Sequence, residues 1–195
     1  DVVESSFAMR KFAIEQDEQG IARLSLNNKP YFPNGVLDQG YWPDGLYTAP
    51  SDEALIEDIQ LMKELGFNTL RKHIKIEPLR WYYHCDRLGM LVWQDMVNGG
   101  GTYSKPAISL PLIFGNAHPD SDYAYFAREE VRGREAYQRE MHETVALLYN
   151  CPCIAMWVPF NEGWGQFDAN RAVEAIRAMD GTRTIDHASG WYDQK

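Results

Sequence analysis

The feature that most constrains the fold is a regular alternation of short apolar runs and amphipathic helical patterns from residue 35 onward. Five apolar runs predict strands, at residues 36–37, 67–70, 90–93, 154–158 and 183–186. Such alternation predicts a parallel sheet covered by helices, an α/β fold. The repeat averages about 31 residues, so eight units would need about 248, close to the roughly 250 residues of a (β/α)8 barrel.

We therefore predict a partial (β/α)8 TIM barrel containing about strands 1–5. A doubly wound open sheet is the structural alternative, although the glycine-rich dinucleotide fingerprint is missing. Four helices are predicted: one opened by residues 50–53 and ended by Gly66, one opened by Pro78 and ended by Gly89, and two at residues 123–149 and 168–179. Residues 98–122 are expected to form a long loop.

The first 34 residues predict β structure ahead of this repeat. Residues 6–14 are rich in aromatic and apolar side chains, which favours a strand. Residues 21–32 predict a β-hairpin, because Asn27 and Asn28 tolerate the positive φ of a tight turn.

Composition excludes several classes of partner. The 28 acidic residues outnumber 19 basic ones, and the net charge of -9 would repel a polyphosphate backbone, so no nucleic-acid partner is expected. The longest apolar run, residues 153–160, is far short of the roughly 18 residues of a membrane span, so no membrane partner is expected. No signal-peptide pattern is present. A chain that begins at Asp1 fits a processed protein or an excised fragment; the compartment stays unassigned, with a soluble protein of the periplasm or the extracellular space compatible.

The cysteine count predicts free thiols, and the aromatic content bears on the kind of cleft or core that the chain forms. The three cysteines, Cys85, Cys151 and Cys153, are odd in number and lack a two-residue spacer, which predicts buried free thiols. Aromatic residues make up 13% of the chain. That share suits a cleft that stacks on sugar rings, although large cores use the same residues.

The most informative segment is residues 154–165 (IAMWVPFNEGWG), where a buried strand runs into an amide, a carboxylate and a glycine-flanked indole. In parallel barrels, catalytic groups sit at the C-terminal ends of strands. Glu162 is therefore placed to donate or accept a proton. The alternative is a carboxylate that caps the next helix, a role for which Asp168 is better placed.

Several motifs occur in a specific order and spacing over nearly the whole chain. They are residues 7–11 (FAMRK), 26–30 (LNNKP), 34–36 (NGV), 66–71 (GFNTLR), 88–92 (LGMLV) and 150–162 (NCPCIAMWVPFNE). Together they resemble the catalytic domain of glycoside hydrolase family 2, which includes β-galactosidases, β-glucuronidases and β-mannosidases. The resemblance implies that residues 1–14 are a remnant strand of an immunoglobulin-like domain and that residues 15–195 are the N-terminal part of the barrel, truncated after its fifth strand.

The resemblance also implies a retaining β-glycosidase with an acid/base glutamate after the fourth strand and a nucleophile after the seventh. Glu162 would be the acid/base, Asn161 would contact the sugar 2-hydroxyl, and Arg71 would orient the nucleophile. The strand of the nucleophile would lie beyond Lys195, so the fragment alone is expected to be inactive. No organic cofactor is implied, and no clear metal-ligand set is visible.

Departures from the family pattern leave the sugar unidentified. Members commonly show Arg-x-Ser-His where this chain has residues 71–75 (RKHIK), and an Asp-Glu pair where it has residues 93–96 (WQDM). Val158, Pro159 and Phe160 precede Asn161, where smaller residues are common. The acid/base assignment is unaffected by these changes.

Four further residues are candidates for substrate binding, each with a structural alternative. His73 would line the cleft or bond to backbone. Asp95 would contact a sugar hydroxyl or a cation, or form a salt bridge with Arg71. Trp164 and Trp191 would stack on sugar or pack in the core.

Two other functions stay open. One is a non-hydrolytic carbohydrate-binding module, and the other is a metal-dependent hydrolase using His73, Asp95 and His187. Barrel edges left unpaired by truncation also predict possible self-association.

Overall fold

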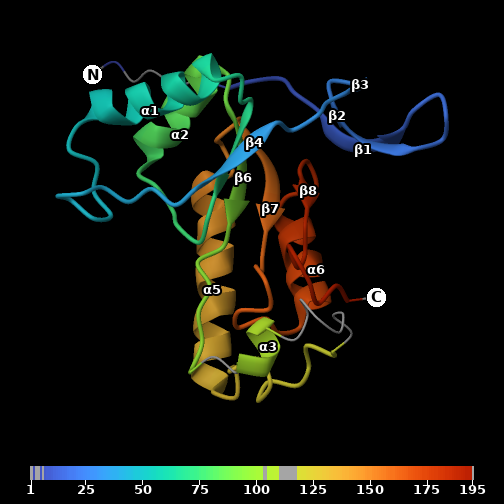
Figure 1. The fold of residues 1–195 in the computed structure, drawn as a ribbon. Helices are drawn as coiled ribbons and strands as arrows, with labels where there is room; N and C mark the ends of the chain where they lie inside the picture. The colour runs from blue at the N-terminus through green and yellow to red at the C-terminus, as the bar shows by residue number, and fades with distance from the viewer. Residues whose placement is uncertain (1, 3–4, 6, 103–104, 110–117, 195) are drawn as a thin grey trace.

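The computed structural model describes residues 2, 5, 7–102, 105–109 and 118–194. Its centre is a parallel sheet of five strands in the order β4-β5-β6-β7-β8 (Figure 1). The strands are β4 (Gly35–Asp38), β5 (Thr69–Lys72), β6 (Leu91–Asp95), β7 (Ile154–Val158) and β8 (Thr184–Ile185). All five residues of β7 are buried, as expected for a strand covered on both faces.

The strand order follows the order of the chain. Each strand pairs with the next one along the sequence, from Gly35 opposite Thr69 in β4 and β5 to Trp157 opposite Ile185 in β7 and β8. A doubly wound sheet reverses direction at a switch point, whereas a barrel winds one way throughout. The prediction of a partial TIM barrel is therefore confirmed, and the open-sheet alternative is wrong.

Two helices, α1 (Asp52–Glu64) and α2 (Leu79–Leu88), pack against each other, and α2 also contacts β6 (Figure 1). Ser51 caps α1, because its side chain accepts a hydrogen bond from the Ala54 amide at 3.2 Å. Gly89 ends α2 in the left-handed conformation with φ of 69°. Pro78 occupies the N-cap position of α2, one residue before the helix begins.

A second helix pair, α5 (Val131–Leu148) and α6 (Ala169–Met179), covers the sheet beside β7 and β8. The helix predicted over residues 123–149 is wrong for residues 123–130, because residues 123–127 form turns and residues 128–130 have no regular structure. Ala127 has a φ of 57°, which interrupts any helix, and the Asp122 side chain accepts from the Tyr125 amide at 3.2 Å. The predicted loop at residues 98–122 contains a short helix, α3 (Lys105–Ser109), while residues 103–104 and 110–117 lie outside the described residues.

The predicted cap of α6 also differs. Asp168 stands at the N-cap position with φ of 44°, but its side chain makes no capping hydrogen bond. Its carboxylate instead accepts from Tyr123 Oη at 3.0 Å, and the Ala169 amide is bound by Asp120 Oδ2 at 2.8 Å. The start of α6 is therefore satisfied by a distant segment of the chain.

The N-terminal residues form an antiparallel sheet of β1 (Phe12–Gln16), β2 (Ala22–Leu26) and β3 (Lys29–Pro30), which extends away from the helices in Figure 1. Asn27 and Asn28 have φ of 54° and 63°, which confirms the predicted turn. The strand predicted over residues 6–14 begins only at Phe12; Ser6 lies outside the described residues. Tyr31 Oη donates to the carbonyl of Asn68, just before β5, so this sheet meets the barrel at the N-terminal ends of its strands. The assignment of residues 1–14 to a separate domain remains a prediction.

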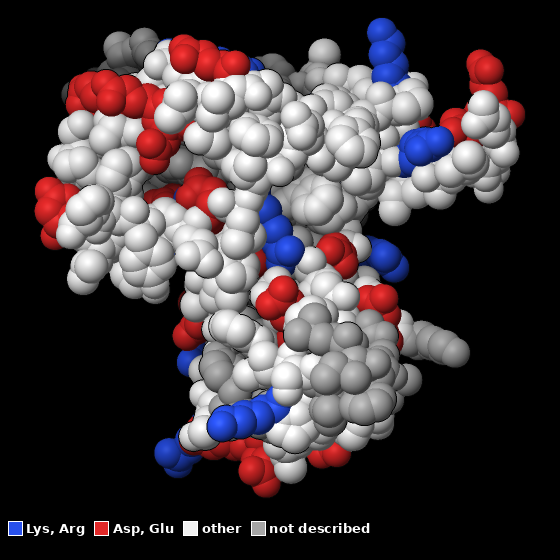
Figure 2. Space-filling model, in the orientation of Figure 1, with Lys and Arg blue, Asp and Glu red and all other residues white. Residues whose placement is uncertain are grey.

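The three cysteines are free and buried, as predicted. Burial raises the pKa of the Cys151 thiol to about 11, which disfavours the reactive thiolate. No helix in the described part of the chain is long and apolar enough to cross a bilayer. The surface in Figure 2 intersperses acidic and basic side chains, and α1 alone carries five acidic residues against one lysine.

Candidate active site

The C-terminal ends of β5, β6 and β7 meet at Arg71. Its guanidinium donates to both carboxylate oxygens of Asp95, through Nε at 2.9 Å and Nη2 at 3.2 Å. It also donates to Asn161 Oδ1 and to Ser189 Oγ, each at 2.8 Å. One arginine therefore links residues that follow or end four different strands, which fixes the geometry of this end of the barrel.

Asp95 lies in this ion pair and is only 1% exposed. Burial raises its pKa, and the hydrogen bonds and charge of Arg71 oppose that shift. Of the two roles expected for Asp95, the structure shows the salt bridge with Arg71. Ser189, which the sequence did not single out for this role, completes the arginine's set of partners.

Glu162 follows β7 with an unusual backbone. Its φ is 51°, in the left-handed region that residues with side chains rarely adopt, and Gly163 follows at 68°. Its amide donates to the Ser189 carbonyl at 2.8 Å, while its residue remains partly exposed. Strain of this kind costs about 1–3 kcal/mol and clusters at functional sites.

Two glycines allow the chain to hold Glu162 in place. A Cβ added at Gly163 would lie 2.5 Å from the ring of Tyr192, and one added at Gly190 would lie 3.1 Å from Glu162 Cγ. Tyr192 is itself fixed, since its hydroxyl donates to the Ala107 carbonyl at 2.8 Å. The loop after β8 thus packs closely against Glu162 and its neighbour.

A pocket of about 280 Å³ opens at the same end of the sheet. Its lining combines the loop after β4, the loop after β5, and the segments near residues 98 and 164. The lining residues are Gln39, Tyr41, Tyr47, His73, Ile74, Lys75, Asn98 and Trp164. His73 and Trp164, both predicted to face a cleft, line it together.

Gln39, Tyr41 and Tyr47 were missed as functional candidates. The available signal was the polar, aromatic-rich composition of the loop after the first barrel strand. Trp191 is partly buried and is not among the residues that line this pocket. Its indole nitrogen has no hydrogen-bond partner among the described residues.

The residues of the alternative function, a metal-dependent hydrolase, each have other partners. His73 Nδ1 lies 3.2 Å from Gln39 Nε2, Asp95 pairs with Arg71, and His187 Nε2 accepts from the Gln194 amide at 2.9 Å. Within the described residues, no group of three or more His, Cys, Asp or Glu side chains could hold a metal ion.

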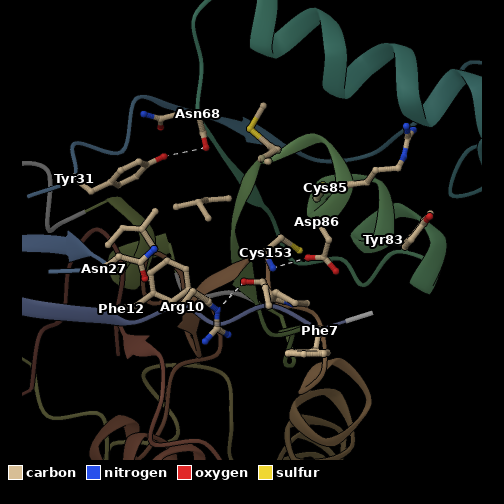
Figure 3. A pocket seen from close by; sticks show the side chains of 17 residues that line it. Phe7, Arg10, Phe12, Asn27, Tyr31, Asn68, Tyr83, Cys85, Asp86 and Cys153 are labelled. Carbon is tan, nitrogen blue, oxygen red and sulfur yellow. Dashed lines mark hydrogen bonds between the residues drawn. The ribbon is translucent and has the colours of Figure 1, made fainter. Parts of the chain in front are cut away.

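A larger cavity, of about 600 Å³, lies at the opposite end of the strands (Figure 3). It is lined by Asn68, Met90 and Cys153, which lie before or at the starts of strands. Figure 3 shows Cys153 donating its amide to Asp86 at 2.6 Å beside this space. Barrel chemistry belongs to the C-terminal ends of strands, so this cavity is not the candidate active site.

Comparisons with known proteins agree with the barrel fold. The family model described as "Glycosyl hydrolases family 2, TIM barrel domain" matches residues 21–195. A β-galactosidase of Lactococcus lactis subsp. lactis (strain IL1403) is 36% identical over 87 residues, 45% of this chain and 8% of that protein. A β-galactosidase of Yersinia pestis bv. Antiqua (strain Angola) is 29% identical over 168 residues, 86% of this chain and 14% of that protein.

Solved structures show the same fold at low sequence identity. The β-D-glucuronidase of Dictyoglomus thermophilum superimposes with a TM-score of 0.70 and 18% identity, covering 92% of this chain and 28% of that one. The chain therefore spans 8% and 14% of the lengths of these two curated relatives.

Proposed function

The chain belongs to glycosyl hydrolase family 2, through its TIM barrel domain, and on that premise we propose that it supplies the acid/base half of the active site of a retaining β-glycosidase. Glu162 is the proposed acid/base. The observation that carries the proposal is its position: it follows β7 directly, partly exposed, in a strained backbone held by the Ser189 carbonyl. Two named relatives are β-galactosidases, which supports a carbohydrate substrate.

The proposed reaction has two proton transfers through one carboxyl group. Glu162 first protonates the oxygen that leaves the sugar, and its carboxylate then removes a proton from the water that attacks in the second step. A residue that serves both steps must reach the bond being broken and also solvent. The partial exposure of Glu162 is compatible with both requirements.

Asn161 is placed to recognise the sugar beside that carboxyl. Because Arg71 can only donate, Asn161 presents its Oδ1 to Arg71 Nη2 at 2.8 Å, and its amide nitrogen is the group that remains to donate. We assign that amide to the sugar 2-hydroxyl, a contact that strengthens in the transition state. Arg71 is then a positioning residue for Asn161, and we also propose that it orients the nucleophile.

Retention requires a second carboxylate about 5–5.5 Å from the first. The family's barrel closes eight strands, while the sheet described for this chain has five. We propose that the nucleophile belongs to a strand outside these five. The isolated 195-residue chain is accordingly expected to show no turnover.

The decisive test uses the longest protein that carries this sequence, with Glu162→Ala. A general acid matters only when the leaving group is poor, so turnover of alkyl β-glycosides should fall by about 10²–10⁴-fold. The kcat/KM for dinitrophenyl β-glycosides, which reports the first step alone, should fall much less, while their kcat falls because the second step lacks its general base. Added azide should restore turnover of the activated substrate and give the β-glycosyl azide, because azide needs no general base.

Other outcomes identify other functions. Equal losses for good and poor leaving groups would remove the acid/base role from Glu162. Sugar affinity without turnover in the long protein would favour a carbohydrate-binding module. Activity abolished by a chelator and restored by a divalent metal would favour the metal-dependent hydrolase.

A further inference from the structure

The loop after β4 is one wall of the pocket at the mouth, and a buried ammonium group holds it. Lys75 Nζ donates to the carbonyls of Gly40 at 2.5 Å and Tyr47 at 3.0 Å, and pairs with Glu77 Oε1 at 2.8 Å. Lys75 is 5% exposed, and its three donors have three acceptors. The loop therefore has a fixed backbone where it faces the pocket.

This fixed loop presents two aromatic rings. Tyr41 donates its hydroxyl to the Tyr47 hydroxyl at 2.8 Å, and their ring centroids lie 4.9 Å apart. Both side chains line the pocket and stay more than half exposed, at 59% and 58%. Trp164 lines the same space. Exposed aromatic faces on a rigid wall suit the C–H face of a sugar ring.

A polar pair lies beside these rings. Gln39 Nε2 is 3.2 Å from His73 Nδ1. The amide and the imidazole are hydrogen-bonded to each other in this arrangement. The pocket thus offers an imidazole and a side-chain amide, whose polar atoms suit the hydroxyl groups of a sugar.

Three cations near this wall, Arg71, Lys72 and Lys75, already have carboxylate partners. Arg71 pairs with Asp95. Lys72 is 1% exposed and pairs with Asp38 at 2.8 Å and Glu77 at 2.9 Å, and Lys75 shares Glu77. These three cations share three carboxylates, and a fourth, the buried Arg128, donates to Asn98 Oδ1 and to the Gly165 carbonyl.

We propose that this pocket is a subsite for one uncharged sugar ring and that it selects against uronic acids. The inference rests on the proposed function only for the statement that the ligand is a sugar. The pocket volume of about 280 Å³ is near the roughly 300 Å³ of the smallest ligand pockets. A carboxylate on the sugar would lose water, and Lys75, the lysine that lines the pocket, already has three acceptors.

The test measures binding to the 195-residue chain, so it needs no turnover. The probes are methyl β-D-galactopyranoside and methyl β-D-galactopyranosiduronate, which differ only in a hydroxymethyl or a carboxylate at C6. Titration followed by amide chemical shifts should give a dissociation constant about tenfold lower for the neutral ring. Equal or tighter binding of the uronate would overturn the proposal, and so would the absence of binding by both probes.

Variants locate the binding. Tyr47→Ala should raise the dissociation constant of the neutral sugar roughly 3- to 10-fold, because one aromatic contact is lost. Tyr47→Phe keeps the ring and should retain affinity within about twofold. The matched control is Tyr83→Ala, a half-exposed tyrosine that lines the cavity at the opposite end, and it should bind like the wild type. Unchanged affinity in Tyr47→Ala would contradict the subsite.

A second variant tests the subsite if Tyr47→Ala does not fold. If circular dichroism shows that Tyr47→Ala is unfolded, Gln39→Ala removes the polar pair instead and should weaken binding by a similar factor. A uronate preference would reject the subsite and leave the acid/base proposal intact, whereas equal leaving-group effects in Glu162→Ala would reject the acid/base proposal and leave the subsite intact.

Discussion

Glu162 depends on neighbours that lack side chains. Gly163 continues its left-handed backbone and leaves room for the Tyr192 ring, which a Cβ would approach to 2.5 Å. Local sequence predicted the position of Glu162 at a strand end. It could not predict the contact with Tyr192, because that contact joins two different loops.

Gly163→Ala should therefore destabilise the fold by about 1–3 kcal/mol, since it adds both a clash and a strained φ. Urea unfolding followed by circular dichroism measures this free energy. The matched control is Gly181→Ala, where the nearest atom to an added Cβ is the Arg177 carbonyl oxygen at 3.9 Å. That variant should stay within about 0.5 kcal/mol of wild type. Similar stability in both variants would contradict the packing described around Glu162.

Arg71 is a second residue whose partners come from separate elements. Lysine would keep the positive charge but could not bind both oxygens of Asp95 together with Asn161 and Ser189. We expect Arg71→Lys to lower the free energy of unfolding by about 1–3 kcal/mol, because buried acceptors lose donors. Arg87→Lys, at the exposed end of α2, is the control. An unfolding midpoint of Arg71→Lys equal to that of the wild type would contradict a stabilising role for the four hydrogen bonds of Arg71.

At the scale of elements, the sequence predicted the five barrel strands and their order of appearance, because buried parallel strands are continuous apolar runs. The predictions failed where distant contacts decide the backbone. Residues 123–130 resemble a helix in sequence, yet Arg128 is buried and donates to the Gly165 carbonyl at 2.7 Å. Asp168 resembles a cap, yet Asp120 supplies the acceptor for the start of α6. Neither partner can be identified from residues nearby in the chain.

Asp180, at the end of α6, joins three elements and makes their stability depend on pH. Burial opposes its ionisation, but hydrogen bonds from Thr182, Trp157 and Arg183 outweigh burial and lower its pKa from 3.8 to about 2. Because the pKa of Asp180 is lower in the folded than in the unfolded chain, its ionised carboxylate stabilises the fold at pH values above 3.8. This stabilisation is lost as the pH falls from 3.8 toward 2.

Asp180→Asn should thus be less stable than wild type by about 2 kcal/mol at pH 7, and the gap should close as the pH falls through this window. Thermal unfolding at a series of pH values measures both. Thr182→Ala, which removes one of several donors, should produce a smaller gap of the same sign. A constant gap between pH 5 and 2 would assign the loss to packing instead of charge.

At the scale of the whole molecule, the five-stranded sheet has two outer strands, β4 and β8, with no further strand paired to them in the described chain. Unpaired strand edges favour association between molecules. Leu37 in β4 is 54% exposed, which adds apolar surface at one edge. We predict concentration-dependent self-association of the isolated chain, measured by analytical ultracentrifugation.

Leu37→Lys should reduce this association by placing a charge on the edge strand. The matched control is Leu61→Lys, an exposed leucine of α1 that lies on no sheet edge. Equal association of the two variants would place the contact elsewhere. A wild-type monomer at all concentrations would show that the edges do not pair.

The pairing of Glu162 with Ser189 has a consequence for synthesis on the ribosome. Glu162 is made 27 positions before Ser189, whose carbonyl binds its amide, and Tyr192 follows later still. A nascent chain that has folded only its first four barrel strands therefore lacks the hydrogen bond that fixes the backbone of Glu162. The backbone of residue 162 is therefore fixed only after the loop that follows β8 has been synthesised.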